Sequence, residues 1–406
     1  MNKRILLSTP HMTGNERKYI DEAFDTNWIA PLGPNVDAFE KEIAQYNDIK
    51  GASVTSSGTA AIHLALAILG VSKGDHVFVA SFTFVASANP VLYLGAEPVF
   101  IDSEAETWNM SPEALEVGLK EAKAENRLPK AIVVVNLYGQ SAKMDELLDI
   151  AERYQVPIVE DAAESLGATY KNKKSGTFGK IGIYSFNGNK IITTSGGGAL
   201  VSDDEEIIAK AKFLSTQAKD DAPYYQHSQV GYNYRMSNVV AGIGRAQLEV
   251  LDDRVDRRRE LFNNYIEELG SIDGVTFMPE MEGTRSNRWL TTLTIDASKF
   301  NALPQEFMSN MDSAGIETRA LWKPLHLQPL FKKTAFYSNP YSNKPVSEQL
   351  FDSGMCLPSG TNMTDFDQMR VINEMKKLLN ASRKRVHVFS WNRKTGSLAK
   401  LQHKIN

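Results

Sequence analysis

The sequence predicts an α/β fold with a mostly parallel central sheet, helices on both faces, and a smaller C-terminal α/β domain. Its strand candidates are short, largely apolar and without polar alternation, at 76–80, 97–101, 131–135 and 157–160. Helical segments separate them, at 112–124 and 143–154. Strands of this kind are buried on both faces of a parallel sheet, and ligands bind where such strands end.

The chain is long enough for two domains. It has 406 residues, of which 42% are hydrophobic and 23% charged, as in an ordinary globular protein. We expect a large domain over 1–250, a small domain over 251–380 and a basic tail over 381–406. The charged run 252–259 marks a hinge between the domains, although it also fits a solvated helix face. The tail contains seven Lys and Arg, no Asp or Glu, and no clear periodicity.

Charge and cysteine content argue against several classes of protein. The net charge is -4 although the tail is basic, and an acidic body argues against nucleic-acid binding. Cys356 is the single cysteine, so no internal disulfide can form, which fits a reducing cytosol. No cysteine cluster or paired-histidine motif predicts a metal site. The apolar run near the N-terminus is only three residues long, and no run approaches membrane-spanning length, so we expect a cytoplasmic protein.

Lys190 stands in an unusual place. An apolar strand candidate at 181–186 ends in a small polar loop that carries this lysine, and three glycines follow at 196–198. Both neighbours indicate burial, and a desolvated lysine amine is more nucleophilic. This is what a Schiff-base lysine for pyridoxal phosphate requires. A lone lysine, taken by itself, more often extends along the surface with its amine in water.

Two further strand ends carry side chains suited to a cofactor. A strand at 51–55 runs into Ser57, Gly58 and Thr59 at the start of a helix over 60–69, where free backbone N–H groups can cradle a phosphate. The same residues also suit a simple helix N-cap. Phe84 lies just past the strand 76–80 and could stack on a flat ring or pack in the core.

Asp161 follows the buried strand 157–160. A buried carboxylate is costly without a charged partner, and the pyridinium nitrogen of pyridoxal phosphate would be such a partner. The alternative is an aspartate that caps the next helix. Asp161 precedes Lys190 by 29 residues, which leaves room for a strand pair and a loop between them.

The N-terminal region predicts two helices and a stiff loop. Thr13 and Glu16 have the spacing of a capping box, which predicts a helix over 13–27. Helical spacing resumes over 35–46. The loop between them contains Trp28, two prolines and a glycine, and it could pack internally or form one wall of a binding site.

Together these motifs resemble the DegT/StrS-type sugar aminotransferases, pyridoxal-phosphate enzymes with the aspartate aminotransferase fold (fold type I). The resemblance covers about residues 5–380. The motifs that carry it are 57–61, 83–84, 160–164, 185–190 and 231–235, in this order.

The resemblance implies a role for each matching residue. Lys190 holds the cofactor covalently and moves the proton between carbon centres, and Asp161 pairs with the ring nitrogen. Phe84 stacks on the ring, while Glu164 lies near the ring and the substrate. The phosphate is held by residues of two motifs, namely Ser57, Gly58, Thr59 and Ser185. Asn233 reaches the cofactor phosphate of the neighbouring subunit, which implies a homodimer with shared active sites.

The segments 214–219, 227–238 and 321–329 are similar to transaminases of the UDP-N-acetylbacillosamine type. This similarity implies a UDP-linked 4-keto-6-deoxy-N-acetyl sugar as substrate, glutamate as amino donor, and a role in polysaccharide biosynthesis. Trp28, Glu164 and His326 are the candidate substrate-binding residues. The alternatives are another nucleotide keto sugar, dTDP-linked or 3-keto, and a sensor that binds the cofactor without turnover. A related sugar dehydratase would carry histidine in place of Lys190.

Overall fold

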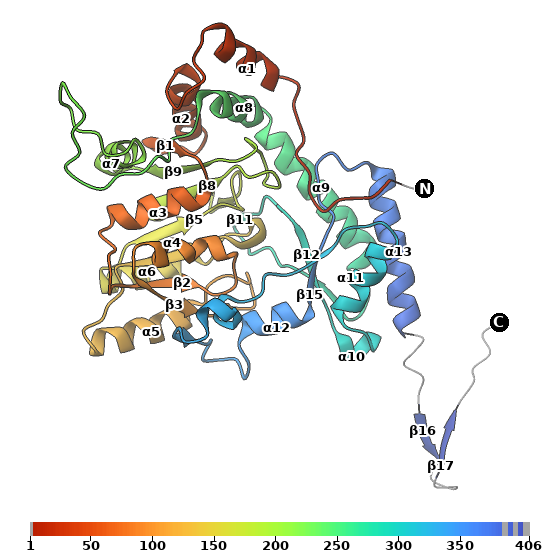
Figure 1. Cartoon of the computed structure of the whole chain (residues 1–406). Coiled ribbons are helices and arrows are strands. Elements are labelled where there is room, and N and C mark those ends of the chain that lie inside the picture. The colour runs from red at the N-terminus through yellow and green to blue at the C-terminus, as the bar shows by residue number, and fades with distance from the viewer. Residues whose placement is uncertain (1–2, 384–388, 393–396, 401–406) are drawn as a thin grey trace.

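The computed structural model describes residues 3–383, 389–392 and 397–400 of the chain. An eight-stranded sheet forms the centre of the larger part (Figure 1). Its strands, in spatial order, are β1 (Gly51–Thr55), β9 (Gly198–Ser202), β8 (Ile181–Ser185), β5 (Ile158–Asp161), β4 (Ala131–Val135), β2 (His76–Ala80), β3 (Glu97–Ile101) and β14 (Phe336–Tyr337). The strands from β8 to β14 run parallel to one another, whereas β9 is antiparallel to both of its neighbours. The predicted, mostly parallel sheet is therefore confirmed.

Side chains of one strand point alternately to two hydrophobic layers, as the pleat of a strand requires. In β2, Val77 and Val79 face one layer while Phe78 and Ala80 face the other. The first layer is covered by α3 (Gly58–Ile68), α4 (Asn89–Tyr93) and α7 (Glu205–Ser215). The second is covered by α5 (Pro112–Ala124) and α6 (Met144–Tyr154). Burial on both faces explains why these strands are apolar without alternation.

A smaller antiparallel sheet forms the second part. Its strands, in order, are β10 (Val275–Phe277), β12 (Thr291–Ile295), β15 (Gly354–Leu357) and β13 (Arg319–Ala320). Helices pack with it, namely α9 (Leu251–Leu269), α10 (Ala297–Phe300), α11 (Pro304–Ser313), α12 (Val346–Ser353) and α13 (Asp365–Arg383). The charged run 252–259 lies within α9, which packs on the large part through Val255 and on the small part through Leu261.

The first N-terminal helix is shorter than predicted at both ends, and it finishes at Asp25 and not at residue 27. The first helix, α1 (Glu16–Asp25), begins three residues after Thr13, because Gly14 adopts a φ of +100° and interrupts the helical path. Glu16 accepts hydrogen bonds from the N–H groups of Thr13 and Gly14, but the Thr13 hydroxyl accepts one from Asn15. Only half of the predicted capping box forms. The helix α8 (Asn238–Leu248) packs against both α1 and α2 (Pro34–Tyr46).

The remaining elements are short. A three-stranded sheet consists of β11 (Thr284–Arg285), β6 (Thr169–Tyr170) and β7 (Lys173–Lys174). The tail predicted from residue 381 begins inside α13, which continues to Arg383. In the tail, β16 (Phe389–Asn392) pairs with β17 (Ser397–Lys400), and residues 384–388, 393–396 and 401–406 lie outside the described residues. Within the described ranges, every helix is too short or too polar to cross a membrane.

Candidate functional site

A cavity of about 220 Å³ lies at the carboxyl ends of the central parallel strands, and we call it the central cavity. Parallel sheets bind ligands at this edge, because the connecting loops diverge there. The wall contains the first turn of α3, the loop after β2, the ends of β4, β5 and β8, and the glycine loop before β9. Its lining residues are Ser57, Gly58, Thr59, Ile62, Thr83, Phe84, Ala86, Ser87, Val135, Asp161, Ala163, Glu164, Ser185, Asn187, Lys190, Gly196 and Gly197.

Lys190 reaches this cavity from the loop after β8. Only 13% of its side chain is exposed. Its Nζ lies 3.7 Å from Glu164 Oε1 and 4.1 Å from the centre of the Trp289 ring. The side chain is therefore packed between a carboxylate and an aromatic face, and it does not extend along the surface.

Asp161 is the last residue of β5, the strand beside β8, so its carboxylate and the Lys190 loop lie at the same end of the sheet. The carboxylate accepts hydrogen bonds from Ser87 Oγ at 2.7 Å and from the Ala163 N–H at 3.1 Å. Burial raises the pKa of Asp161, although these two bonds and the charge of Lys190 oppose that change. Across the described residues Asp161 has no ion-pair partner, so a bound cation would stabilise its charge.

Glu164 is also buried, and its two oxygens have different neighbours. Oε1 faces Lys190, while Oε2 accepts a hydrogen bond from the Tyr138 N–H at 2.7 Å. Burial raises the pKa of Glu164, and the charge of Lys190 lowers it. Tyr138 has a φ of 51°, which is strained for a bulky residue, and its ring stacks between Trp289 and Trp322. The stacked rings hold the Tyr138 backbone in this strained conformation, in which its N–H points toward Glu164.

The first turn of α3 lines another part of the central cavity. Ser57 caps this helix by accepting a hydrogen bond from the Ala60 N–H at 3.1 Å, and it also lines the cavity. The cap and the proposed phosphate cradle are therefore compatible. Gly198 lies so close that a Cβ there would be 2.5 Å from the Gly58 nitrogen, and a Cβ on Gly58 would be 3.0 Å from Ser185 Cβ. Both glycines allow the backbone to close around the helix N-terminus.

Of the other predicted site residues, one lines the central cavity and three do not. Phe84 lines it and is 50% exposed, with its ring 5.1 Å from that of Trp322. Trp28 and Asn233 are exposed, and neither lines the cavity. His326 is fixed elsewhere, because its Nδ1 lies 2.7 Å from Ser81 Oγ and its Nε2 lies 3.1 Å from Glu348 Oε1. The roles of these residues stay predictions.

Sequence reasoning missed three residues beside the cavity. Ser87 contacts Asp161, Tyr138 contacts Glu164, and the Trp289 ring lies over the Lys190 amine. Ser87 had a local signal, because it is a polar residue soon after the strand 76–80. Tyr138 and Trp289 had none, because nothing in their neighbouring sequence relates them to Asp161 or Lys190.

A second hollow of about 450 Å³ adjoins the central cavity and shares Thr83 and Phe84 with it. The rest of its wall comes mainly from the aromatic, basic loop predicted over 321–329, including Trp322, Lys323 and Pro329. It offers apolar faces and one lysine next to the cavity that Lys190 and Asp161 line.

Comparison with known proteins gives consistent matches. Residues 10–376 match the DegT/DnrJ/EryC1/StrS aminotransferase family. EpsN of Bacillus subtilis, a protein named as a pyridoxal phosphate-dependent aminotransferase, is 58% identical over 392 residues, which cover 96% of this chain and 99% of EpsN. GDP-perosamine synthase of Caulobacter vibrioides is 36% identical over 377 residues, with 93% and 98% covered. The crystal structure of a DegT DnrJ EryC1 StrS aminotransferase from Brucella abortus matches with a TM-score of 0.83 at 30% identity, covering 90% of this chain and 95% of that one. The predicted fold type is confirmed.

The cofactor is pyridoxal phosphate, and the central cavity suits it. Its phosphate fits the free N–H groups at the start of α3, where Gly58 and Gly198 leave space. Its ring nitrogen can supply the ion-pair partner that Asp161 lacks among the described residues. Its aldehyde requires a partly desolvated amine, and Lys190 is the lysine among the lining residues.

Proposed function

Because the chain belongs to the DegT/DnrJ/EryC1/StrS aminotransferase family, in which it is a pyridoxal-phosphate-dependent sugar aminotransferase, we propose that it transfers an amino group from glutamate to UDP-4-keto-6-deoxy-N-acetylglucosamine. The observation that carries the site assignment is the pair of Lys190 and Asp161 in one cavity, where the Asp161 carboxylate forms no ion pair among the described residues although the charge of Lys190 lowers its pKa. The choice of sugar rests on the similarity of the segments 214–219, 227–238 and 321–329 to UDP-N-acetylbacillosamine transaminases.

Each residue of the site has a separate task in this proposal. Pyridoxal phosphate, when bound, supplies the electron sink that makes amino transfer feasible. Asp161 stabilises positive charge at the ring nitrogen, and Ser87 keeps its carboxylate in place. The first turn of α3 binds the phosphate. The Lys190 amine binds the cofactor and later carries the proton, and Glu164 Oε1, 3.7 Å away, keeps that amine oriented.

The hollow beside the central cavity supports a nucleotide-linked substrate. Trp322 and Pro329 provide apolar faces for a base or sugar ring, and Lys323 provides a positive charge for a pyrophosphate. These three residues suit any nucleotide-linked sugar. A GDP-perosamine synthase is accordingly among the relatives.

A substrate panel tests the choice of sugar. We expect purified enzyme with glutamate to aminate UDP-4-keto-6-deoxy-N-acetylglucosamine with a higher kcat/KM than GDP-linked, dTDP-linked or 3-keto sugars, measured by mass spectrometry of the amino-sugar product. Lys190→Ala protein serves as the control for non-enzymatic amination. Preference for a GDP- or dTDP-linked sugar would contradict the substrate and leave the aminotransferase reaction intact. No turnover with any sugar, together with bound cofactor, would favour the sensor.

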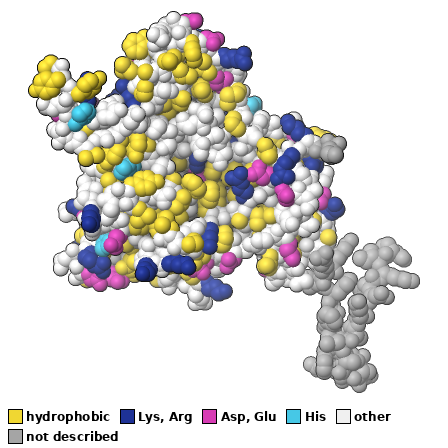
Figure 2. Space-filling view, in the orientation of Figure 1, with side chains coloured by type: hydrophobic (Ala, Val, Ile, Leu, Met, Phe, Trp, Pro, Cys, Tyr) yellow, Lys and Arg dark blue, Asp and Glu magenta, His cyan; other side chains and the backbone are white. Residues whose placement is uncertain are grey.

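We also propose a homodimer with shared active sites, in which Asn233 reaches the partner's cofactor phosphate. The loop between α7 and α8 carries Asn233 and projects from the body of the chain (Figure 1). Tyr224, Tyr225 and Val230 on this loop are 65%, 85% and 77% exposed, and hydrophobic side chains are visible at its tip (Figure 2). Exposed apolar side chains on a projecting loop are suited to contact with a second subunit.

Mixed dimers test the shared site. Lys190→Ala and Asn233→Ala chains are each expected to be severely impaired alone. In a mixed dimer, one site carries both defects, while the other has an intact Lys190 and borrows an intact Asn233 from its partner. Activity should therefore reappear, up to one working site per mixed dimer. Absence of recovery in demonstrably mixed dimers would mean that Asn233 serves its own chain or has no role at the phosphate.

A further inference from the structure

The backbone carbonyl of Asn189, the residue before Lys190, is held by two side chains from distant parts of the chain. Trp289 Nε1 donates a hydrogen bond to it at 2.7 Å, and Ser8 Oγ donates another at 3.1 Å. Ser8 precedes α1 and Trp289 precedes β12, so neither belongs to the large sheet that carries the lysine loop. The position of Lys190 therefore depends on contacts from outside that sheet.

Arg258 organises both donors. It lies in α9 and is 2% exposed. Its Nη1 donates to the Trp289 carbonyl at 2.5 Å, and its Nη2 donates to Ser8 Oγ at 2.9 Å. A guanidinium can only donate, so Ser8 Oγ accepts from Arg258 and keeps its own proton for Asn189. One buried arginine thus fixes the two groups that hold the same carbonyl.

Burying the charge of Arg258 costs folding free energy. Within the described ranges it makes no ion pair with a carboxylate, and its Nε has no hydrogen-bond partner there. Burial lowers the pKa of Arg258 to about 9, which still leaves it charged at neutral pH. A buried cation without a carboxylate destabilises the folded state, so its placement favours a role other than stability.

We propose that Arg258, Ser8 and Trp289 form a clamp that positions Lys190 for reaction with the cofactor, a proposal that rests on the role assigned to Lys190 above. The three are positioning residues, because they act through Asn189. Trp289 has a second function in the clamp, since its ring lies 4.1 Å from the Lys190 amine and holds that amine by a cation–π contact while it is free and charged. The clamp restricts the conformations of the Lys190 side chain, so that its amine stays close to the position from which it reacts with the cofactor.

The test measures how fast the apoprotein attaches pyridoxal phosphate covalently. Samples are quenched with borohydride at successive times, and the label on Lys190 is quantified by peptide mapping. Trp289→Phe keeps a ring near the amine but removes the Nε1 donor, and Ser8→Ala removes the other donor. We expect attachment to slow by about fivefold in each, the ordinary scale of one lost hydrogen bond. Ser8→Thr, which keeps a hydroxyl, should restore the rate.

Controls separate positioning from general loss of stability. Trp108→Phe makes the same change at another buried tryptophan of the same hydrophobic cluster, one that makes no described contact with Asn189 or Lys190, and it should leave the attachment rate unchanged. Melting temperatures of all apoproteins are measured alongside. Wild-type attachment rates in both Trp289→Phe and Ser8→Ala would overturn the clamp, whatever their melting temperatures. If the wild-type protein carries the label on another lysine, the role of Lys190 and the clamp both fail, whereas label on Lys190 with unchanged variant rates removes the clamp alone.

Discussion

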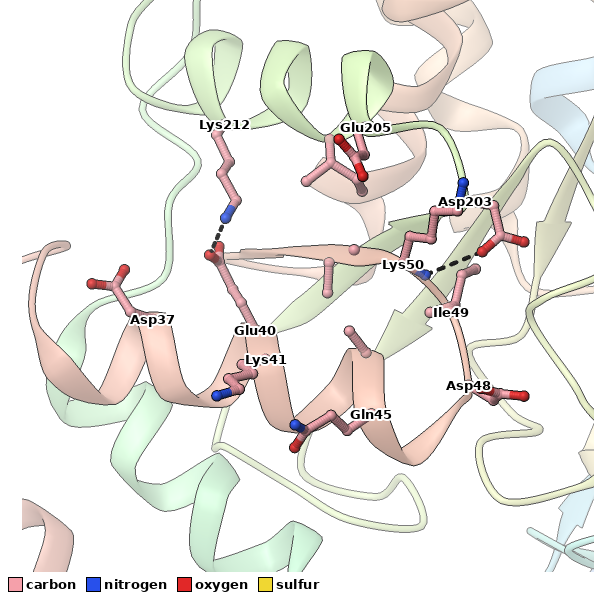
Figure 3. Close-up of a pocket in the computed structure, with 14 residues that line it drawn as sticks. Asp37, Glu40, Lys41, Gln45, Asp48, Ile49, Lys50, Asp203, Glu205 and Lys212 are labelled. Carbon is pink, nitrogen blue, oxygen red and sulfur yellow. Dashed lines mark hydrogen bonds and ion pairs between the residues drawn. The ribbon is translucent and has the colours of Figure 1, made fainter.

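Two cavities of this protein differ in size and in how their buried charges are balanced. The central cavity, at about 220 Å³, is the smaller. A cavity of about 790 Å³ lies at the sheet edge, between α2, β1 and α7, and we call it the edge cavity (Figure 3). Its lining residues are Asp37, Glu40, Lys41, Ala44, Gln45, Asp48, Ile49, Lys50, Gly51, Ala52, Asp203, Glu205, Ile208 and Lys212.

The buried carboxylate of the edge cavity has its partners within the protein. Glu40 is 4% exposed, and its Oε2 lies 2.7 Å from Lys212 Nζ (Figure 3). Its Oε1 accepts a hydrogen bond from the Val54 N–H at 3.1 Å, so it also covers a donor on the edge strand β1. Glu40 is thus part of the scaffold.

The larger of the two cavities is therefore not the one to which we assign the reaction. Asp161 is as well buried as Glu40 but forms no ion pair in the described part of the chain, and the more distant charge of Lys190 only partly offsets its burial. It also lies at the carboxyl end of parallel strands, whereas the edge cavity flanks the outermost strand. An unbalanced buried charge at that end of the sheet is the feature that predicts ligand chemistry.

Replacing one lysine of each cavity by alanine should give the largest difference in kcat between two variants. Lys190→Ala removes the amine to which we assign cofactor binding and proton transfer, and we expect kcat to fall by roughly 10⁴-fold, the upper range for a positioned proton-transfer group. Lys212→Ala should keep kcat within about twofold, because Lys212 contacts only the scaffold carboxylate Glu40 among the described ion pairs. Steady-state kinetics with glutamate and keto sugar measure both. Comparable losses in the two variants would remove the distinction between the cavities.

The carboxylates provide a second, smaller contrast. Asp161→Asn keeps the size of the side chain but not its charge, so the ring nitrogen of the cofactor loses its counter-ion. We expect turnover to fall by roughly 10³-fold, the scale of a lost charge interaction in a dry site. Glu40→Gln should leave turnover unchanged. Near-normal turnover in Asp161→Asn protein, with cofactor bound, would contradict the role of Asp161.

The smallest expected effect is on stability and its pH dependence. Because burial raises the folded-state pKa of Asp161 above its ordinary value of 3.8, protonation stabilises the apoprotein at low pH. This contribution is lost as the pH rises through the raised pKa, because over that range the folded state holds a proton that the unfolded state has already released. An asparagine side chain at the same position does not titrate. We therefore expect Asp161→Asn apoprotein to become more stable than wild type above that pH, by roughly 1 kcal/mol.

Denaturant unfolding of both apoproteins from pH 4 to 8 measures this difference. Saturating pyridoxal phosphate should reverse it, because the bound cofactor gives Asp161 a cation and stabilises the wild-type protein more. An apoprotein difference that is independent of pH would mean that Asp161 is already compensated within the protein.

The sequence alone determined the features that depend on local pattern. Apolar runs without alternation predicted the strands of the parallel sheet, since burial on both faces excludes polar side chains. The positions of Asp161 and Lys190 after the ends of strands followed from the same pattern, whereas the pairing of those two strands, β5 and β8, is seen only in the structure. The capping box at Thr13 formed only in half for an equally local reason, namely the left-handed backbone of Gly14.

Only the tertiary structure decided which residues surround Lys190. Ser8 and Asn189 are separated by 181 positions, and Trp289 and Asn189 by 100, yet their side-chain and backbone atoms are in hydrogen-bond contact. No periodicity or spacing encodes such pairs, because they arise from the way α9, the small sheet and the N-terminal segment pack against the large sheet. The same packing gives Glu40 an ion pair with Lys212 and leaves Asp161 without an ion pair among the described residues, so the balance of buried charge could not be obtained from the sequence.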